Sequence, residues 1–307
     1  MPDYSIIIQN ISKSYGQVKA LTDVSFQVEH SEIFGLIGPD GAGKTTLFRI
    51  LTSLLIPDSG VATVEGFDVV KSYKQIRQIT GYMPGRFSLY YDLTVEENLN
   101  FFATIFGTTI EENYHLIRDI YVQIEPFKKR RAGNLSGGMK QKLALSCALI
   151  HKPKVLVLDE PTTGVDAVSR KEFWEMLAKL KEQDITIIVS TPYMDEASLC
   201  DHVALIQKGK IMTIDTPAKI IEAYPDPLYK VSGPNMFNLL NQLRNFPKAK
   251  SAHRFGDSIH VAMKGDFGQA EIEDFTKEKG HEEIQVKPVN ATIEDSFMAL
   301  MNTNNDK

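Results

Sequence analysis

The sequence contains only two cysteines in 307 residues, Cys147 and Cys200. So few cysteines exclude a fold stapled by disulfides and favour a reduced compartment in which both thiols stay free. Long apolar runs are also missing, because the most apolar stretch, around residues 101–110, is interrupted by threonines and a glycine. A helix needs about 18 apolar residues to cross a bilayer. We therefore expect any membrane role of this chain to come through a partner.

Basic charge is scarce as well. The 34 Lys and Arg residues are outnumbered by 39 Asp and Glu residues, which gives a net charge of −5 and a pI near 5.9. This balance argues against nucleic acid as the main partner. The short basic run at residues 128–131 is expected to be a solvated helix end. The length suffices for one large domain and a smaller one.

One segment fits the phosphate-loop pattern at every fixed position. It consists of Gly38, Pro39, Asp40, Gly41, Ala42, Gly43, Lys44 and Thr45, followed by Thr46. An apolar run precedes it and apolar residues at helical spacing follow, so the loop connects a strand to a helix and is not an ordinary glycine-rich turn. Such a loop turns backbone N–H groups and a helix N-terminus toward phosphates. We expect Lys44 to reach the β- and γ-phosphates of a nucleoside triphosphate and the Thr45 hydroxyl to bind Mg²⁺.

Two carboxylates, Asp159 and Glu160, follow the apolar run at residues 155–158. This pattern predicts a buried strand that delivers acids to its carboxyl end, where ligands of open parallel sheets bind. Asp159 can hold Mg²⁺ through water, and Glu160 can act as general base toward an attacking water. Downstream of a phosphate loop, and preceded by the Leu-Ser-Gly-Gly motif at residues 135–138, this pair is a far more specific signal than it is alone.

Together these motifs resemble the ATP-binding subunits of ATP-binding-cassette (ABC) transporters, over about residues 6–223. The resemblance implies a head-to-tail dimer in which a signature motif binds the ATP that the opposite subunit holds. It further implies that Asp166 belongs to a D-loop between the two sites. Tyr15 falls where the family stacks an aromatic ring on adenine, although a strand-edge tyrosine is the alternative. The signature residues are Leu135, Ser136, Gly137, Gly138 and Gln141.

The sequence departs from the family at two positions that matter for catalysis. Gly85 stands where the family carries a glutamine that contacts Mg²⁺ and the attacking water, and Pro192 stands where it carries a histidine for the γ-phosphate. Proline offers neither a side-chain donor nor an N–H. Losing one preorganised donor costs about 10²–10³ in rate, and two such losses need not multiply. We expect this site to bind ATP but to turn it over slowly. Asp40 is a milder change, at a loop position that often holds asparagine.

These departures favour an asymmetric heterodimer. In it, the signature motif of this chain completes a competent site on a second ATP-binding subunit. The alternatives are a homodimer with two weakened sites and a site whose gap is filled by His202 or by a partner residue. Other function classes are a regulatory subunit without useful turnover and a cassette ATPase acting on ribosomes or DNA, which the acidic balance disfavours.

The resemblance also implies partners and a location. The most similar subgroup is that of drug and polyketide exporters, in view of the segments at residues 82–99 and 193–197. The expected partners are integral membrane permease subunits, which would hold this chain in the cytoplasm against the inner face of the cell membrane. Phe87, Tyr90 and Tyr91 are candidate contacts with a permease, or ordinary half-buried aromatics.

The predicted fold class is α/β, a P-loop NTPase core with a mainly parallel sheet. An antiparallel β-subdomain precedes the core, and a helical subdomain occupies about residues 95–150. Two prolines mark a boundary between an ATP-binding domain at residues 1–224 and a small α/β appendage at residues 225–307. In the appendage we expect strands at 228–231, 258–263 and 284–286 and helices at 236–244, 269–279 and 293–301, with Thr292 as a cap and a disordered tail at 302–307.

Overall fold

The computed structural model describes residues 4–265 and 267–305. The chain divides into two compact units, residues 1–217 and 218–307, which are described separately. The boundary predicted at residues 224 and 225 lies slightly further along the chain. Helix α7 (Pro217–Glu222) is assigned almost wholly to the second unit. It is tied to that unit by the hydroxyl of Ser296, which donates a hydrogen bond to the Ile220 carbonyl at 3.2 Å.

The first unit is built on a mainly parallel sheet of six strands, in the order β10-β9-β3-β8-β7-β6. All neighbours are parallel except β9 and β10. All five residues of β3 and of β7 are buried, which accounts for their continuous apolar sequence. The predicted parallel core is thus confirmed. Its strands are β3 (Ile33–Ile37), β6 (Thr80–Met83), β7 (Val155–Asp159), β8 (Thr186–Thr191), β9 (His202–Gln207) and β10 (Lys210–Asp215).

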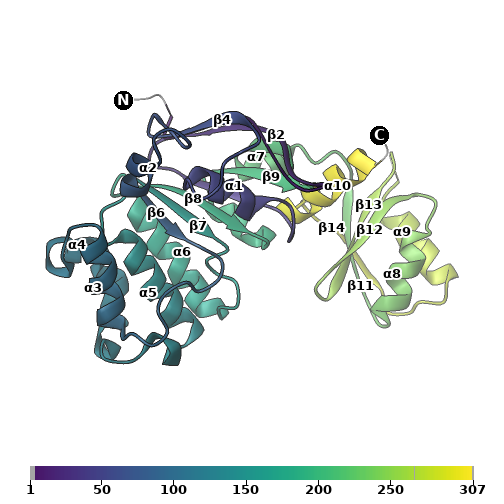
Figure 1. The fold of residues 1–307 in the computed structure, drawn as a ribbon. Helices are drawn as coiled ribbons and strands as arrows, with labels where there is room; N and C mark the ends of the chain where they lie inside the picture. Colours follow the sequence, from purple (N-terminus) through teal and green to yellow (C-terminus); the bar gives the residue numbers. More distant parts are fainter. Residues whose placement is uncertain (1–3, 266, 306–307) are drawn as a thin grey trace. The chain divides into compact units, whose positions relative to one another are not determined.

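A second, antiparallel sheet in the order β2-β1-β4-β5 forms the expected β-subdomain. Helix α1 (Lys44–Leu51) lies between the two sheets (Figure 1). Its fully buried Leu47 and Phe48 belong to one hydrophobic core with residues of both sheets, among them Ile6 and Val157. This packing holds the start of α1 rigidly. The strands are β1 (Ile6–Tyr15), β2 (Val18–Val28), β4 (Ser59–Val64) and β5 (Phe67–Asp68), and helix α2 (Tyr73–Ile79) follows them.

The helical subdomain is present where it was predicted. Helices α3 (Val95–Ile105) and α4 (Ile110–Tyr121) each begin with a capping box, formed by a threonine and a glutamate three residues later. Both helices contact α5 (Gly137–Leu149), and the three lie together in Figure 1. The basic run at residues 128–131 had been expected to be the end of a helix. It follows a short 3-10 helix at residues 125–127 and does not end an α-helix. Helix α6 (Ala167–Lys181) follows β7.

The second unit is an antiparallel sheet in the order β12-β13-β11-β14, with α8 and α9 contributing to its core. The predicted elements are present, except that strand β12 was missed because its sequence, AKSAHRF, lacks a clear apolar alternation. The Thr292 hydroxyl accepts a hydrogen bond from the Asp295 N–H, as a cap does. The elements are β11 (Leu228–Ser232), α8 (Met236–Arg244), β12 (Ala249–Phe255), β13 (Ser258–Met263), α9 (Gln269–Glu278), β14 (Gln285–Pro288) and α10 (Ile293–Asn305).

Helix α10 corrects one expectation about the end of the chain. Residues 302–305 are helical, so the predicted disordered tail is wrong for them, and residues 306 and 307 lie outside the described part. Among the described residues, no helix is both long and apolar enough to span a bilayer.

Candidate functional site

The predicted phosphate loop runs from the end of β3 to the start of α1. Gly41 and Gly43 adopt positive φ angles of 77° and 108°, a region that favours glycine. A Cβ on Gly43 would lie 2.4 Å from the Ala20 carbonyl oxygen, so the loop passes too close to β2 for any side chain at that position. The backbone thus has the tight curvature that a phosphate cradle requires.

Lys44 is the charged centre of this loop. Its side chain is only 3% exposed, and its ammonium donates hydrogen bonds to the carbonyls of Gly38 at 2.7 Å and Pro39 at 3.1 Å. The same ammonium lies 3.1 Å from Oε1 of Glu160. The structure therefore brings the predicted phosphate ligand and the predicted general base into direct contact, although they are far apart in the sequence.

A cavity of about 290 Å³ lies along the loop. Tyr15, at the end of β1, is 47% exposed and lines this cavity, where its ring is available for stacking. The curvature of the loop, the buried ammonium and the exposed ring suit a nucleoside triphosphate. The cavity is lined by Tyr15, Val18, Lys19, Ala20, Asp40, Gly41, Ala42, Gly43, Lys44, Thr45, Thr46 and Glu160.

The two predicted carboxylates lie where β7 ends. Asp159 is 3% exposed and accepts a hydrogen bond from the Ser190 hydroxyl on β8 at 2.7 Å. Glu160 has a φ of 51°, unusual for a residue other than glycine, and its N–H donates to the Ser190 carbonyl at 3.0 Å. Ser190, whose role was not foreseen, thus holds the carboxylate of Asp159 and the backbone of Glu160. Such a link between two strands has no local signal in the sequence.

Mg²⁺ suits this arrangement. The ion takes few protein ligands and completes its shell with water and substrate phosphates. Asp159 and the Thr45 hydroxyl are the residues that would hold it, and the ion would supply positive charge beside the phosphates. In residues 4–265 and 267–305 there is no cluster of three or more His, Cys, Asp or Glu side chains that could bind a metal without such help.

Gly85 and Pro192 border this corner. A Cβ on Gly85 would lie 3.0 Å from the Asp159 carbonyl oxygen and 3.8 Å from its Oδ2, so a side chain at this position would extend over the magnesium ligand. Pro192 directly follows Thr191, whose carbonyl accepts a hydrogen bond from the Gly38 N–H at 3.4 Å. Gly85 therefore lies beside Asp159, and Pro192 follows the residue that contacts the start of the phosphate loop. Neither position carries a side-chain donor.

His202 does not lie at this gap, so the part of that alternative that names His202 is wrong. In the parallel pairing of β3 with β9, His202 lies opposite Phe34, near the start of both strands. The phosphate loop follows Ile37 at the other end, about 10 Å away at the rise of a β-strand. The imidazole Nδ1 lies 2.7 Å from Oε2 of Glu32 and is engaged there.

The signature residues do not line the nucleotide cavity of their own chain. Ser136 caps α5, with its hydroxyl accepting a hydrogen bond from the Met139 N–H at 3.3 Å, and Ser136 and Gly137 are exposed. Asp166 caps α6, and hydrogen bonds from the Ser169 backbone and side chain lower the pKa of its carboxyl. Both helix starts therefore expose residues of the predicted motifs at the surface.

The same two helix starts also pack against each other. A Cβ on Gly138 would lie 2.8 Å from the Ser169 hydroxyl, and one on Gly137 would lie 3.3 Å from the Gly164 carbonyl oxygen. The signature motif and the predicted D-loop therefore form one surface.

Comparison with known proteins bears on this geometry. A family model described as "ABC transporter" matches residues 21–163. A protein of Escherichia coli K12 named "Probable multidrug ABC transporter ATP-binding protein YbhF" is 38% identical over 98% of this chain. This chain spans only about half, 53%, of the length of that relative.

Two further matches cover most of the other protein. "Nod factor export ATP-binding protein I" of Burkholderia lata is 36% identical over 81% of this chain and 83% of its own. The solved structure of CbiO1 from Clostridium perfringens, described as part of an ABC transporter complex, shares 25% identity and a TM-score of 0.64, covering 72% of this chain and 92% of its own. With the phosphate loop, the paired acids and the signature helix in place, the chain belongs to the ATP-binding proteins of ABC transporters, which are ATPases.

Proposed function

We propose that this chain energises export through a separate membrane permease and that its own nucleotide site is catalytically weakened. Its place would be in the cytoplasm, against the inner face of the cell membrane. The names of two relatives, one a Nod factor export protein and one a probable multidrug transporter protein, support export as the direction. The observation that carries the weakened site is the absence of side-chain donors at Gly85, beside Asp159, and at Pro192, next to the residue that contacts the start of the phosphate loop.

Binding and turnover depend on different residues here. The loop backbone, Lys44 and Thr45 remain to bind the phosphates, and Glu160 remains as a base. What is missing is the pair of side chains that would orient the attacking water. The chain would therefore bind Mg-ATP well and hydrolyse it slowly.

The surface that serves a second subunit is complete by contrast. Ser136 and Gly137 are exposed at the start of α5, and Asp166 is exposed at the start of α6. A partner that carries the missing glutamine and histidine would place its ATP against this surface. The asymmetric heterodimer explains why one set of residues is degenerate while the other is intact. A homodimer with two slow sites is the alternative.

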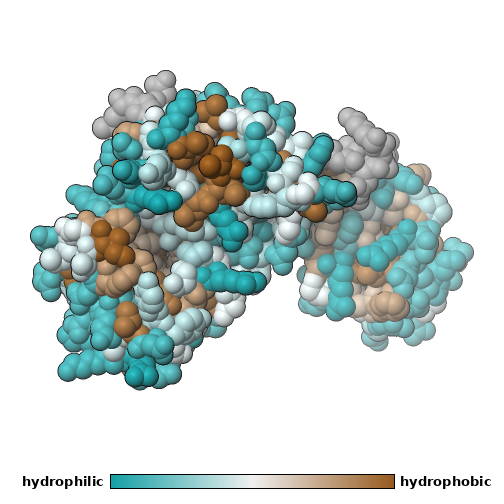
Figure 2. Space-filling view, in the orientation of Figure 1, coloured by the Kyte–Doolittle hydropathy of each residue, from teal (hydrophilic) through white to brown (hydrophobic). Residues whose placement is uncertain are grey.

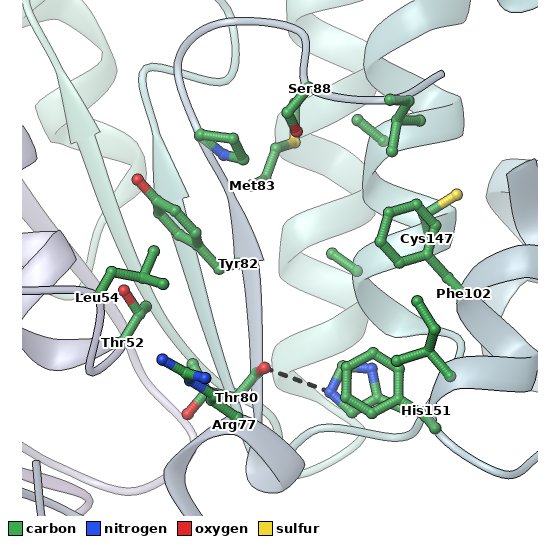
Figure 3. A pocket seen from close by; sticks show the side chains of 16 residues that line it. Thr52, Leu54, Arg77, Thr80, Tyr82, Met83, Ser88, Phe102, Cys147 and His151 are labelled. Atoms are coloured by element: carbon green, nitrogen blue, oxygen red, sulfur yellow. Dashed lines mark hydrogen bonds between the residues drawn. The ribbon is translucent and has the colours of Figure 1, made fainter. Parts of the chain in front are cut away.

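A cavity of about 630 Å³ between β6, α3 and α5 is our candidate for permease docking. Figure 3 shows Thr52, Leu54 and Tyr82 on one wall and Phe102 and Cys147 on the other. Leu54 and Ile105 at its rim are more than half exposed. In Figure 2, brown surface lies over the α1–β4 region and over α3 and α4. An inserted apolar segment would bury this surface.

The aromatics predicted as permease contacts do not line that cavity. Phe87 and Tyr91 instead pack edge to face and lie within 6 Å of the Lys140 ammonium. The residues we now put forward for the contact are Tyr82, Phe102 and Phe106. They were not put forward from the sequence because Tyr82 lies in a strand and Phe102 in a helix, where apolar periodicity alone indicates core.

Two measurements on the purified chain test the proposal. The first is the affinity for Mg-ATP together with the steady-state rate of hydrolysis, with Glu160→Gln as the inactive reference. We expect saturable binding and a rate close to that of the reference. Robust turnover that Glu160→Gln abolishes would contradict the weakened site and favour a self-sufficient homodimer.

The second measurement is the size of the Glu160→Gln chain with ATP, by light scattering. A heterodimer subunit is expected to stay largely monomeric until a complete partner is added. Stable ATP-dependent dimers of the chain alone would contradict the heterodimer. A regulatory subunit without useful turnover would bind ATP equally well. Its rate of hydrolysis would not rise when Gly85→Gln and Pro192→His restore the side-chain donors.

A further inference from the structure

Glu196 is a buried carboxylate that the nucleotide cavity does not use. It lies in the short 3-10 helix Met194–Leu199, just after Pro192, and is only 2% exposed. A carboxylate taken out of water is costly unless it is paired. Its Oε1 accepts a hydrogen bond from the Thr162 hydroxyl at 2.8 Å, and Thr162 is itself 1% exposed. Its Oε2 has no partner within the described part of the chain.

Thr162 belongs to the turn that leads from the general base to α6. The Thr163 N–H donates to the Glu160 carbonyl at 3.2 Å, and the Val165 N–H donates to the Thr162 carbonyl at 3.3 Å. Asp166 follows and caps α6 through Val168 and Ser169. The bond from Glu196 to Thr162 therefore ties the segment after β8 to the base of the predicted D-loop.

Arg170, in the first turns of α6, makes a second connection to the same segment. Its Nε lies 3.9 Å from Oε1 of Glu196, and its guanidinium stacks 5.0 Å from the centre of the Tyr193 ring. A further nitrogen lies 3.9 Å from the exposed carboxylate of Asp195. The cation thus balances the charge of the buried glutamate and packs α6 against residues 193–196.

We propose that Glu196 is a positioning residue that fixes the turn at residues 162–166 and the start of α6. Because Gly137 and Gly138 pack against Gly164 and Ser169, the position of this turn also locates the signature motif. Glu196 thus holds the surface that would complete the ATP site of a second subunit, and only this last step rests on the proposed function.

Hydrogen–deuterium exchange of the full chain tests this role. In Thr162→Val and in Glu196→Ala, we expect the amides of residues 163–169 to exchange about tenfold faster, because a buried charged hydrogen bond is lost. Glu196→Gln should restore most of the protection, since its amide oxygen can still accept from Thr162. Asp195→Asn is the matched control, because that side chain is 72% exposed and its pair with Arg170, at 3.9 Å, is one that solvent screens; it should leave exchange nearly unchanged.

The amides of the phosphate loop and the Mg-ATP affinity serve as the second readout. Both should stay within about twofold of the wild type, because the positioning acts on another surface. Unchanged exchange at residues 163–169 would overturn the proposal. An equal rise in amide exchange throughout residues 1–217 would also overturn it, because that result would mark Glu196 as a general stabiliser of the unit. If Glu196→Ala does not fold, amide exchange at residues 163–169 in Thr162→Val decides whether the proposal holds. None of these outcomes depends on whether the chain hydrolyses ATP, so a failure of the proposed function would be seen separately.

Discussion

Lys44 is a buried cation whose ammonium is shared between two carbonyls of its own loop and the carboxylate of Glu160. The sequence predicted each of these residues and its chemistry. It did not predict the contact between Lys44 and Glu160, which depends on how α1 packs beside the end of β7, or the support of Asp159 by Ser190, which depends on the register between β7 and β8. Glu196 was noticed only as part of a family pattern, since burial of its carboxylate has no signature in the sequence.

The ion pair between Lys44 and Glu160 has a consequence for ATP binding. Phosphates must compete with the Glu160 carboxylate for the ammonium, and they also meet its negative charge in the same cavity. We therefore expect Glu160→Gln to bind Mg-ATP about 3–10-fold more tightly than the wild type in calorimetry. Weaker binding by the variant would show that the carboxylate assists the nucleotide, and the expected competition would be wrong.

Gly43 gives a sharper test of the phosphate loop. Gly43→Ala places a methyl group 2.4 Å from a backbone oxygen at a φ of 108°, so the loop must move. We expect ATP affinity to fall by more than about tenfold in fluorescence titrations. Gly107→Ala is the control, because Gly107 also has a positive φ, 69°, but a Cβ there meets open space. Equal losses of ATP affinity in both variants would mean that backbone strain, and not the shape of the loop, is responsible.

His151 provides a pH-dependent prediction. Burial lowers the pKa of its imidazole from 6.5 to about 4, although a hydrogen bond to the Thr80 carbonyl opposes the shift. Between those pH values the unfolded chain binds more protons, so this contribution to stability is complete above pH 6.5 and is lost as the pH falls toward 4. His151→Phe keeps the stacking on Phe106. Between pH 7 and pH 5, the urea midpoint of this variant should fall less than that of the wild type. An unchanged pH dependence would contradict the buried neutral imidazole.

At the scale of elements, patterns of apolar residues predicted three of the four strands of the second unit and its helices α8, α9 and α10. Strand β12 was missed because it is an edge strand of the second unit and carries polar and basic side chains. The basic run at residues 128–131 was expected to end a helix, but it follows a 3-10 turn and its last residue pairs with Thr94 in an isolated bridge. Such pairing depends on tertiary contacts.

The capping box of α3 is open to direct measurement. The Thr94 hydroxyl accepts from the Glu97 N–H at 3.2 Å, and Glu97 accepts from the Thr94 N–H at 2.7 Å. Thr94→Ala should lower the free energy of unfolding by about 1 kcal/mol in urea titrations. Thr104→Ala makes the same chemical change at an exposed position where the hydroxyl donates to the Asn100 carbonyl within the same helix, and it should change the free energy of unfolding by less than about 0.5 kcal/mol. A similar cost for both would show that the cap has no special role.

At the scale of the whole molecule, the chain combines an ATP-binding unit with a small antiparallel unit at residues 218–307. The family and the location of the nucleotide site could be predicted from the motifs, because phosphate loops and signature helices are local in sequence. The cavity that we propose for permease docking could not be predicted, because β6, α3 and α5 meet only in the fold.

The central claim is that the chain's own site binds ATP but lacks the groups that orient water. The most direct test is the rate of Mg-ATP hydrolysis by the purified Gly85→Gln/Pro192→His chain, compared with the wild type and with the same variant carrying Glu160→Gln. We predict that the double variant hydrolyses ATP at least about tenfold faster than the wild type, that Glu160→Gln abolishes the gain, and that ATP affinity changes little. A wild type that is already fast, or a well-folded double variant with no gain, would contradict the account.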